Sequence, residues 1–564
     1  MAPNTPAPVR IDQHFVQIDG RNVRYLRGGE GPPLLLIHPS PYNAQCWTGA
    51  MAQWGRHYTC IAPDSPGFGL SDPLPRESMN VDGLTRAIGA FVERLGLQEC
   101  RLVGSHTGAA IALELAVRYP ERFTGVALEA VPLFTPEEQA DWFTDTYFSP
   151  LKVSEHGEHF TWAWTRVRDA DVYFPWLRRQ PQHFYNVGRG TAAKLHQDVL
   201  DYYACARHFV PAYRSAVGYA DQAMRSLAAL DLPALIYASS ADVMACHIDR
   251  LPPLRPNQRG TGLGADAQEM IDTVDAALAA FGGNAPAPDA PPFTPDPAHI
   301  AKRIVTIDGN PVLVRQIGDP GAPAILLLHD APGSAALLEP LMQAMAPSAL
   351  IVGPDLPGCG GSAALPEDAD LADYAQWLDR LCDSLGLGAV AVHGEGLGAS
   401  LALALQAHAP GRVHTLSLNG LFLPDTAQRA EILAHYAPRI AIKDNGSHWY
   451  DLWLMLRDSL TMWPWYGRDA AHVRTVAEPC PPDRLHDWTV EVMKQFDTYH
   501  RFINAALAYD IAVLPASAML CRDPAHRFAV YGGAEPGAAI GSAALRLTRD
   551  PAIDGPALRI ALLG

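Results

Sequence analysis

Two stretches of the chain repeat the same order of apolar runs and amphipathic segments. Each stretch opens with a short apolar run that ends in histidine, PPLLLIHPSP from Pro32 and AILLLHDAPG from Ala324. Uninterrupted apolar runs of this length are typical of strands buried on both faces of a parallel sheet. A second apolar run follows and stops at a Pro/Gly corner, IAPDSPGFG from Ile61 and IVGPDLPGCG from Ile351. The pattern therefore predicts two similar domains, offset by about 290 residues.

A third repeated stretch joins a buried strand directly to an alanine-rich helix through a glycine-bracketed turn. It reads CRLVGSHTGAAIALELA from Cys100 and VAVHGEGLGASLALALQ from Val390. His106 stands at the centre of the first turn, and a register shifted onto Ser105 would spoil both glycine positions. Gly396 stands at the centre of the second turn and offers no functional group. Repeated strand, turn and helix predict parallel strands with crossover helices.

A proline-rich stretch separates the two copies. From Gly282 the sequence reads GGNAPAPDAPPFTPDPAHI, in which prolines and small residues prevent a helix or a packed core. The predicted organisation is a first domain, a semi-rigid linker and a second domain, with one helical lid in each domain. The predicted boundaries are 1–283, 284–302 and 303–564, with the lids at roughly 135–228 and roughly 424–510.

Composition and charge narrow the class of protein. A chain of 564 residues with 48% hydrophobic and 18% charged residues is typical of a soluble globular protein. The net charge of −17, without a run of lysine or arginine, argues against nucleic acid or an anionic membrane as a partner. The N-terminus lacks the apolar core of a signal peptide, and no segment has the length of a membrane span, so a cytoplasmic location is expected.

No cofactor is expected from the motifs. The nine cysteines are irregularly spaced and form neither a disulfide framework nor a zinc pattern. The phosphate-binding loop and the dinucleotide fingerprint are both missing from the sequence, as is any metal-ligand cluster.

The order of the repeated motifs resembles the α/β-hydrolase fold. A His-ended strand, a D-x-P-G-x-G corner and the glycine-bracketed elbow are followed in the first copy by the strands GVALEAV and PALIYASSAD. The resemblance covers nearly the whole chain, twice. It implies an α/β fold of two tandem domains, each a mostly parallel sheet with flanking helices and a helical lid after the sixth strand. It also implies catalytic groups at the carboxyl ends of the strands.

The chain departs from this family at the catalytic positions. The family carries a nucleophile at the elbow, an acid after the seventh strand and a histidine after the eighth. Asp242 suits the acid, but neither RGTGLGADAQEMIDTV from Arg259 nor LTRDPAIDGPALRIALLG from Leu547 supplies the histidine. Neither half therefore has the Ser-His-Asp set, and an acyl-serine stage is not expected.

We interpret His106 as a catalytic acid or base. Near neutral pH an imidazole can take a proton from water or substrate, or give one to a leaving group. The neutral imidazole is expected to be favoured, because the positive end of the helix dipole opposes the imidazolium. The residues expected around it are an acid that orients the ring, Asp242 or Glu129, the neighbour Ser105, and a loop whose backbone supplies an oxyanion donor in the family, His38, Pro39 and Ser40. In the structural alternative the turn is retained although catalysis has been lost, and His106 only forms a hydrogen bond to the lid.

Both predicted lids share the spacing G-x-H-x4-W-x3-R-D-x5-P-W. In the first copy the helical spacing lets His159, Trp164 and Arg168 lie near one side of a helix. In the functional interpretation Trp164 and Trp176 wall an apolar pocket, and Arg168 clamps a carboxylate or carbonyl oxygen. In the structural interpretation Arg168 makes only an ion pair or a cap, and the tryptophans form lid core. The second copy keeps the pattern in full, which favours the structural interpretation.

Two functions from different classes fit these observations. The first is an enzyme that acts on a small, partly apolar carbonyl compound by His-based acid/base chemistry, in hydrolysis, lyase cleavage or decarboxylation, with a degenerate second domain. The second is a non-catalytic binding or scaffold protein derived from a hydrolase. The expected partner is a small-molecule substrate. The two domains are expected to form an intramolecular pseudo-dimer, and homo-oligomerisation is left open.

Overall fold

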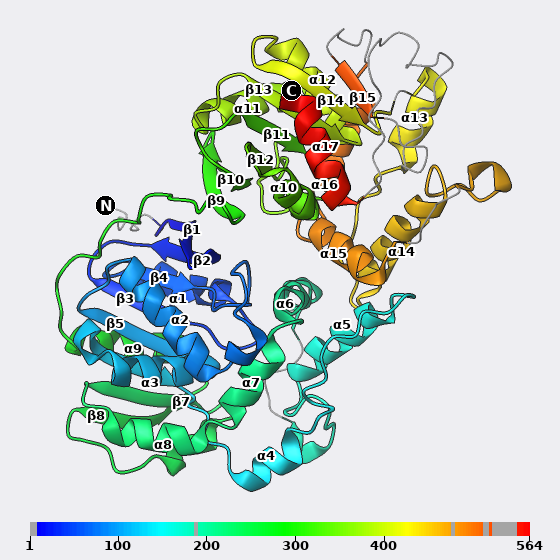
Figure 1. Cartoon of the computed structure of the whole chain (residues 1–564). Helices are drawn as coiled ribbons and strands as arrows, with labels where there is room; N and C mark the ends of the chain where they lie inside the picture. The colour runs from blue at the N-terminus through cyan, green and yellow to red at the C-terminus, as the bar shows by residue number, and fades with distance from the viewer. Residues whose placement is uncertain are drawn as a thin grey trace, which may run out of the picture. The chain divides into compact units, whose positions relative to one another are not determined.

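The computed structural model describes residues 8–184, 190–422, 424–474, 480–510, 518–521 and 550–563. The chain divides into two compact units, whose elements are labelled in Figure 1. The first unit comprises Met1–Lys152 and Trp162–Thr294. The second unit comprises Val153–Thr161 and Pro295–Gly564, so it includes a short piece of chain from the first copy of the repeat.

The described part of the first unit is built on an eight-stranded sheet in the order β1-β2-β4-β3-β5-β6-β7-β8. Pairing is antiparallel between β1 and β2 and between β2 and β4, and parallel from β4 to β8. β3, β4 and β5 are buried along their whole length, as strands with helices on both faces must be. The strands span Ile11–Ile18 (β1), Arg21–Gly28 (β2), Pro33–Ile37 (β3), Thr59–Pro63 (β4), Cys100–Ser105 (β5), Phe123–Glu129 (β6), Ala234–Ser239 (β7) and Gln258–Leu263 (β8).

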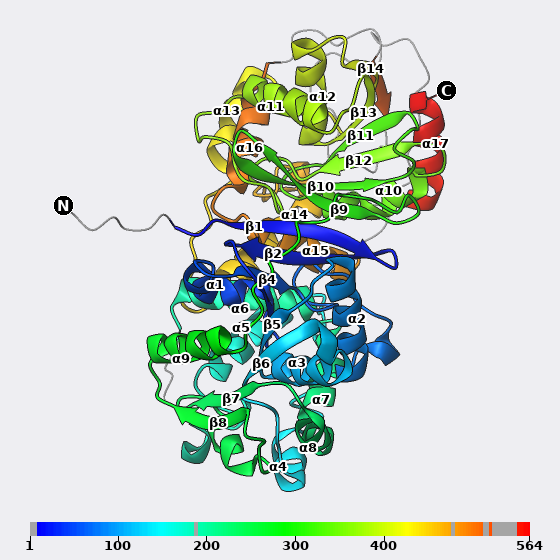
Figure 2. The same cartoon turned by 90° about the vertical axis from the view of Figure 1, so that its left-hand side faces the viewer.

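Helices cover both faces of this sheet (Figure 2). On one face α1 and α9 pack over β3, where Trp54 and Leu278 join Leu36 in one apolar core. On the other face α2, α3 and α8 pack together. These helices span Thr48–Trp54 (α1), Val81–Arg94 (α2), Thr107–Arg118 (α3), Ala220–Ala229 (α8) and Ala267–Ala280 (α9). The lid helices between β6 and α8 span Pro136–Trp142 (α4), Glu158–Ala170 (α5), Ala192–Cys205 (α6) and Phe209–Val217 (α7).

The second unit repeats this architecture. Its described residues form a seven-stranded sheet in the order β15-β14-β13-β11-β12-β10-β9, antiparallel at β9/β10 and β10/β12 and otherwise parallel. The strands span Ala301–Ile307 (β9), Asn310–Ile317 (β10), Ala324–Leu328 (β11), Leu350–Pro354 (β12), Val390–Glu395 (β13), Val413–Asn419 (β14) and Ala518–Cys521 (β15). α10 and α17 lie on one face, and α11, α12 and α16 on the other (Figure 2). The helices span Glu339–Met345 (α10), Leu371–Ser384 (α11), Leu397–His408 (α12), Thr426–His435 (α13), Ser447–Thr461 (α14), Pro482–Met493 (α15), Tyr499–Ala508 (α16) and Pro551–Leu563 (α17).

The predicted fold class is therefore confirmed: two tandem, mostly parallel sheets, each with flanking helices and a helical lid. Within the described ranges, no helix is both long enough and apolar enough to cross a membrane.

The aspartate of the Pro/Gly corner ties together the loops at the carboxyl edge of each sheet. Asp64 is fully buried, pairs with Arg24 at 3.1 Å, and accepts hydrogen bonds from the backbone N–H groups of Ala44 and Leu70. Asp355 repeats the arrangement in the second unit, where it pairs with Arg315 at 2.6 Å. This buried, fully bonded carboxylate fixes the loop after the His-ended strand, which forms one side of the candidate site.

Candidate active site

His106 occupies the sharp turn between β5 and α3. Its backbone angles, φ 54° and ψ −114°, lie in a region that side-chain-bearing residues rarely adopt. The flanking positions are closely packed, because a Cβ on Gly104 would lie 2.2 Å from the carbonyl oxygen of Gly108, and one on Gly108 would lie 2.2 Å from that of Ile37. Both flanking residues must therefore be glycine. The turn then projects the central side chain at the carboxyl edge of the sheet.

The strain of this turn can be measured with two variants that both lack the imidazole. We expect His106→Gly to be more stable than His106→Ala by about 1 kcal/mol, because glycine adopts a positive φ without steric cost and alanine does not. Urea or thermal unfolding of the two variants measures the difference. Glycine loses more backbone entropy on folding than alanine, so a His106→Ala variant clearly more stable than His106→Gly would mean that the turn is unstrained.

Asp242 orients the His106 ring. Its Oδ2 lies 2.7 Å from His106 Nε2, and its Oδ1 accepts a hydrogen bond from the Met244 N–H at 2.7 Å. Burial alone would raise the pKa of Asp242, but attraction to His106 and these hydrogen bonds lower it overall. An ionised carboxylate can only accept a hydrogen bond, so Nε2 carries the proton. The nitrogen that gains and loses a proton is therefore Nδ1, which has no hydrogen-bond partner among the described residues.

The pKa of His106 is raised above its usual value. Burial alone would lower it, but the charge of Asp242 and the hydrogen bond to it outweigh burial, and Glu129 adds a smaller effect in the same direction. The shift of the pKa is therefore opposite in direction to the one expected from the helix dipole, because Asp242 has the larger effect. The carboxylate makes the imidazole a stronger base than a free histidine.

Asp242→Asn is expected to lower the pKa of His106, because it removes the negative charge that stabilises the imidazolium. The raised pKa keeps the ring protonated to higher pH in the native protein, so the variant should begin to lose its proton at lower pH. NMR titration of the His106 imidazole measures both midpoints. A midpoint that stays in place or moves upward would contradict the assigned role of Asp242.

Glu129, the second acid predicted to orient the ring, acts from behind the turn. It ends β6, and its backbone carbonyl accepts a hydrogen bond from the His106 N–H at 2.9 Å. Burial raises the pKa of its carboxyl group, although a hydrogen bond with the Ser105 side chain opposes this. Glu129 therefore supplies negative field beneath the elbow, while Asp242 holds the ring.

A cavity of about 320 Å³ opens beside His106 and Asp242. The His106 side chain is 30% exposed, so its ring reaches this space. Six of the predicted site residues line the cavity: Pro39, Ser40, Ser105, His106, Trp176 and Asp242. Much of the remaining wall is apolar or aromatic and includes Phe134, Tyr147, Phe174 and Tyr213. The volume fits a small, partly apolar molecule.

Three predicted substrate-binding residues lie elsewhere. His38 is buried, donates from Nδ1 to the Pro39 carbonyl at 2.9 Å and accepts the Ser65 N–H at 2.8 Å, so both ring nitrogens are used in holding the loop. Trp164 is buried and is not part of the cavity wall. His159 belongs to the second unit, where its Nε2 lies 3.1 Å from His486 Nδ1.

The predicted clamp Arg168 is exposed and does not line the cavity. Arg166, two residues earlier on α5, is 5% exposed and does line it. A helix turns about 100° per residue, so these two arginines point in clearly different directions. The buried face of α5 includes Ala163, Trp164 and Val167. This apolar spacing indicates that Arg166 lies on the buried face, whereas the motif shared by both copies contains Arg168.

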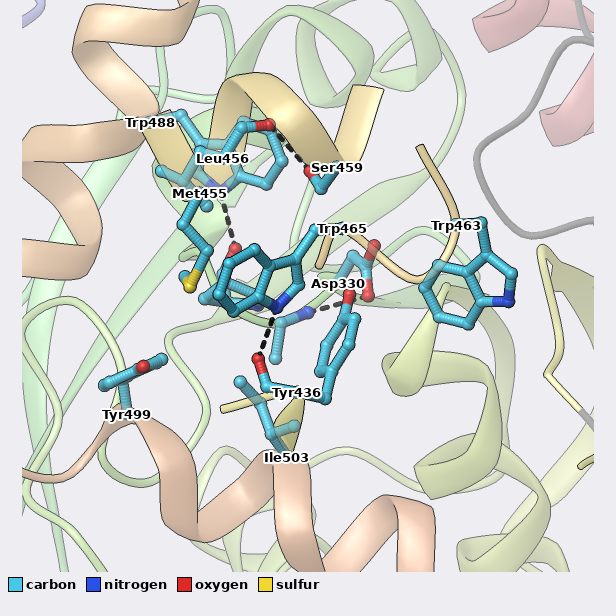
Figure 3. A pocket seen from close by; sticks show the side chains of 12 residues that line it. Asp330, Tyr436, Met455, Leu456, Ser459, Trp463, Trp465, Trp488, Tyr499 and Ile503 are labelled. Carbon is cyan, nitrogen blue, oxygen red and sulfur yellow. Dashed lines mark hydrogen bonds between the residues drawn. The ribbon is translucent and has the colours of Figure 1, made fainter. Parts of the chain in front are cut away.

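The corresponding site of the second unit is nearly closed. Its pocket, lined by Asp330, Met455 and Trp488 among others, has a volume of about 10 Å³, which is room for about one water (Figure 3). Asp330 takes the place of Pro39, and one of its carboxylate oxygens accepts the N–H groups of Ala331 at 2.8 Å and Leu397 at 2.9 Å. These donors correspond in sequence to Ser40 and Thr107 of the first unit. In the second unit, the Asp330 carboxylate therefore occupies the space between two backbone N–H donors.

No histidine stands in the loop after β8, where the family carries one. Only Gly264, Ala265 and Asp266 stand between β8 and α9, and Asp266 caps that helix. Elsewhere in the described ranges, no three His, Cys, Asp or Glu side chains form a group that could hold a metal ion.

The family to which the chain belongs is shown by a model of the alpha/beta hydrolase fold, which matches residues 32–245 and 323–445. The chain is therefore a member of the α/β-hydrolase fold family, as its motifs indicated. It is similar to haloalkane dehalogenase 2 of Mycobacterium tuberculosis, with 34% identity over 106 residues, 19% of this chain and 37% of that protein. It is also similar to an uncharacterized hydrolase of Saccharomyces cerevisiae, with 28% identity over 142 residues, 25% of this chain and 47% of that protein. The chain thus spans less than half the length of either relative.

Solved structures with a similar fold include two epoxide hydrolases. The one from Vigna radiata is 18% identical, with a TM-score of 0.38, and the match covers 48% of this chain and 97% of that one. Epoxide hydrolase A from Mycobacterium thermoresistibile is 21% identical, with a TM-score of 0.36, and the match covers 48% of this chain and 98% of that one.

Proposed function

We propose that the first unit is an enzyme that transfers a proton to or from a small, partly apolar carbonyl compound, in hydrolysis, lyase cleavage or decarboxylation. The observation that carries this proposal is the 2.7 Å hydrogen bond between His106 and Asp242 at the wall of the cavity. A titratable ring, oriented by an ionised acid and open to a largely apolar space, has the properties that general acid–base catalysis requires.

The carbonyl oxygen would lie between the backbone N–H groups of Ser40 and Thr107. Both residues line the cavity, and the corresponding N–H groups of the second unit hold a carboxylate oxygen of Asp330. Pro39 has no carboxylate to occupy this position in the first unit. Two fixed donors would stabilise negative charge that develops on the substrate oxygen.

His106 would move the proton. Its Nδ1 takes a proton from a water molecule or from the substrate, and Asp242 stabilises the imidazolium that forms. The same nitrogen then returns the proton to the leaving group or to the carbon that the leaving group has left. Because no described residue provides the family histidine, these reaction steps include no acyl-serine intermediate.

The second unit is proposed to be a degenerate copy. Gly396 removes the elbow side chain, and Asp330 fills the position of the substrate oxygen. A Cβ on Gly396 would lie 2.0 Å from Asp330 Oδ1, so the carboxylate and an elbow side chain exclude each other.

A turnover screen with the full chain tests the proposal. Wild type and His106→Asn are incubated with esters, β-keto acids and β-hydroxy ketones that carry small apolar groups, and products are followed by mass spectrometry. Conversion by wild type that falls sharply in the variant is expected. Asp330→Ala should convert the same compounds at the wild-type rate, because it alters only the second unit's site. Saturable binding without conversion, unaffected by the His106 variant, would instead support a binding protein.

A fluorophosphonate probe tests the chemistry independently of the substrate. We expect no covalent labelling, because among the described residues neither Ser40 nor Ser105 is hydrogen-bonded to a histidine, and the His106 ring is bonded to Asp242. Stoichiometric labelling of either serine would contradict the role assigned to His106 and identify that serine as the nucleophile.

A further inference from the structure

Arg166 presents an unpaired positive charge to the cavity. Its side chain is 5% exposed, and its Nε is buried without a hydrogen-bond partner among the described residues. The guanidinium lies over aromatic rings instead, 4.6 Å from the centroid of Tyr202 and 5.5 Å from that of Trp176. Aromatic faces attract a cation but accept none of its five N–H groups as a carboxylate does. A buried guanidinium in this state is ready to bind an anion.

The acids nearest to this wall already have partners. Asp198 lines the same cavity but forms an ion pair with Lys194 on its own helix. Asp242 is bonded to His106. Asp201 accepts hydrogen bonds from Asn43 at 2.8 Å and Gln197 at 3.0 Å, and burial raises its pKa to about 6. Arg166 is therefore not needed to neutralise any of them.

The second unit shows that a lid of this kind folds without the arginine. The shared lid spacing places Met455 at the position of Arg166, and Met455 lines the closed pocket of that unit (Figure 3). When Leu195-His196 is aligned with Leu485-His486, Trp488 stands at the position of Asp198, and it donates to the Pro332 carbonyl at 2.6 Å. At these two lid positions the closed pocket thus has uncharged side chains where the open cavity has charged ones. The arginine accompanies the open cavity, which is the relation expected of a ligand-binding group.

We propose that Arg166 binds a carboxylate of the substrate, so that the substrate class is a carboxylic acid with an apolar body and a reactive carbonyl group. Only the reactive carbonyl group in this inference rests on the proposed function, and the carboxylate site does not. The planar guanidinium matches a carboxylate with two parallel hydrogen bonds. The aromatic residues Phe134, Tyr147 and Phe174 would contact the apolar body between Arg166 and His106.

Binding of 3-phenylpropanoate and its neutral analogue 3-phenylpropanamide to the full chain tests the proposal. Isothermal titration calorimetry is expected to show that wild type binds the acid about 10- to 100-fold more tightly than the amide. Arg166→Met, which installs the second unit's own residue, should abolish this preference and leave amide binding within about threefold. Arg168→Met, an exposed position on the same helix, should keep the preference. Phenyl phosphate tests whether the site accepts other anions, and binding tighter than that of the acid would overturn the carboxylate assignment.

The outcomes separate this inference from the proposed function. Equal affinity for acid and amide in wild type, or an unchanged preference in Arg166→Met, would overturn the inference whatever the turnover results. If Arg166→Met does not fold, Arg166→Gln gives the same comparison with a polar, uncharged side chain. His106→Asn should retain the preference for the acid. Undiminished turnover in that variant would overturn the proposed chemistry and leave the carboxylate site standing.

Discussion

His106→Asn is expected to lower kcat of the first unit by about 10²- to 10⁴-fold, the usual contribution of a positioned general acid or base. Asparagine is the sharpest replacement, because it tolerates positive φ better than most residues and so keeps the elbow intact. Its amide can still donate to Asp242 but cannot take up a proton. Steady-state kinetics on any compound that the screen identifies measure the loss.

Two matched variants frame this result. Asp330→Ala, in the second unit, should leave kcat within a few-fold of wild type. Asp242→Asn should retain more activity than His106→Asn at high pH, because its imidazole is present but has a lower pKa. If His106→Asn keeps the wild-type kcat, the histidine takes no part in the mechanism and the elbow has a purely structural role.

The fold was predictable because its signals are local. The apolar runs, the Pro/Gly corners and the glycine-bracketed turns each depend on a few adjacent residues. Gly104 and Gly108 are fixed by backbone atoms less than 2.5 Å from their would-be Cβ positions, so the centre of the turn can be read from the sequence alone. The same locality placed His106 at the elbow of the first unit and Gly396 at that of the second.

The properties of the site depend on contacts between residues that lie far apart in the chain, which local sequence patterns do not reveal. The sequence around the elbow indicates only the helix dipole, whereas the carboxylate that controls the charge state of His106, Asp242, comes from 136 residues away. The motif shared by both copies indicates Arg168. Which of Arg166 and Arg168 faces the cavity depends on where α5 packs, and Tyr202 and Trp176, which contact Arg166, come from separate segments.

The difference between the two sites reduces to coupled substitutions. The first unit has Pro39 with His106, and the second has Asp330 with Gly396. Because Asp330 Oδ1 would lie 2.0 Å from a Cβ at position 396, an aspartate at this loop position requires glycine at the elbow. Occupation of the donor pair by the carboxylate therefore depends on loss of the elbow side chain. The donor pair of the first site stays free because proline provides no carboxylate.

Pro39→Asp is accordingly expected to close the first site and to lower kcat by about 10²- to 10³-fold, the usual loss when an oxyanion donor is removed. The new carboxylate would compete with the His106 side chain for the position in which Asp330 accepts the N–H groups of Ala331 and Leu397, so that either the donor pair is occupied or the imidazole is displaced. Steady-state kinetics measure the loss, with Pro39→Ala as the control that keeps the donors free and should stay within a few-fold of wild type.

Stability measurements show whether this loss arises from the coupling. Pro39→Asp crowds the His106 side chain, so the single variant should unfold at a lower temperature than wild type. Adding His106→Gly rebuilds the second unit's pair, and the double variant should be more stable than Pro39→Asp alone. If Pro39→Asp is as active as Pro39→Ala although its stability falls as expected, the two N–H groups do not hold the substrate oxygen. If the double variant is no more stable than Pro39→Asp, the carboxylate of residue 39 does not enter the elbow as Asp330 does.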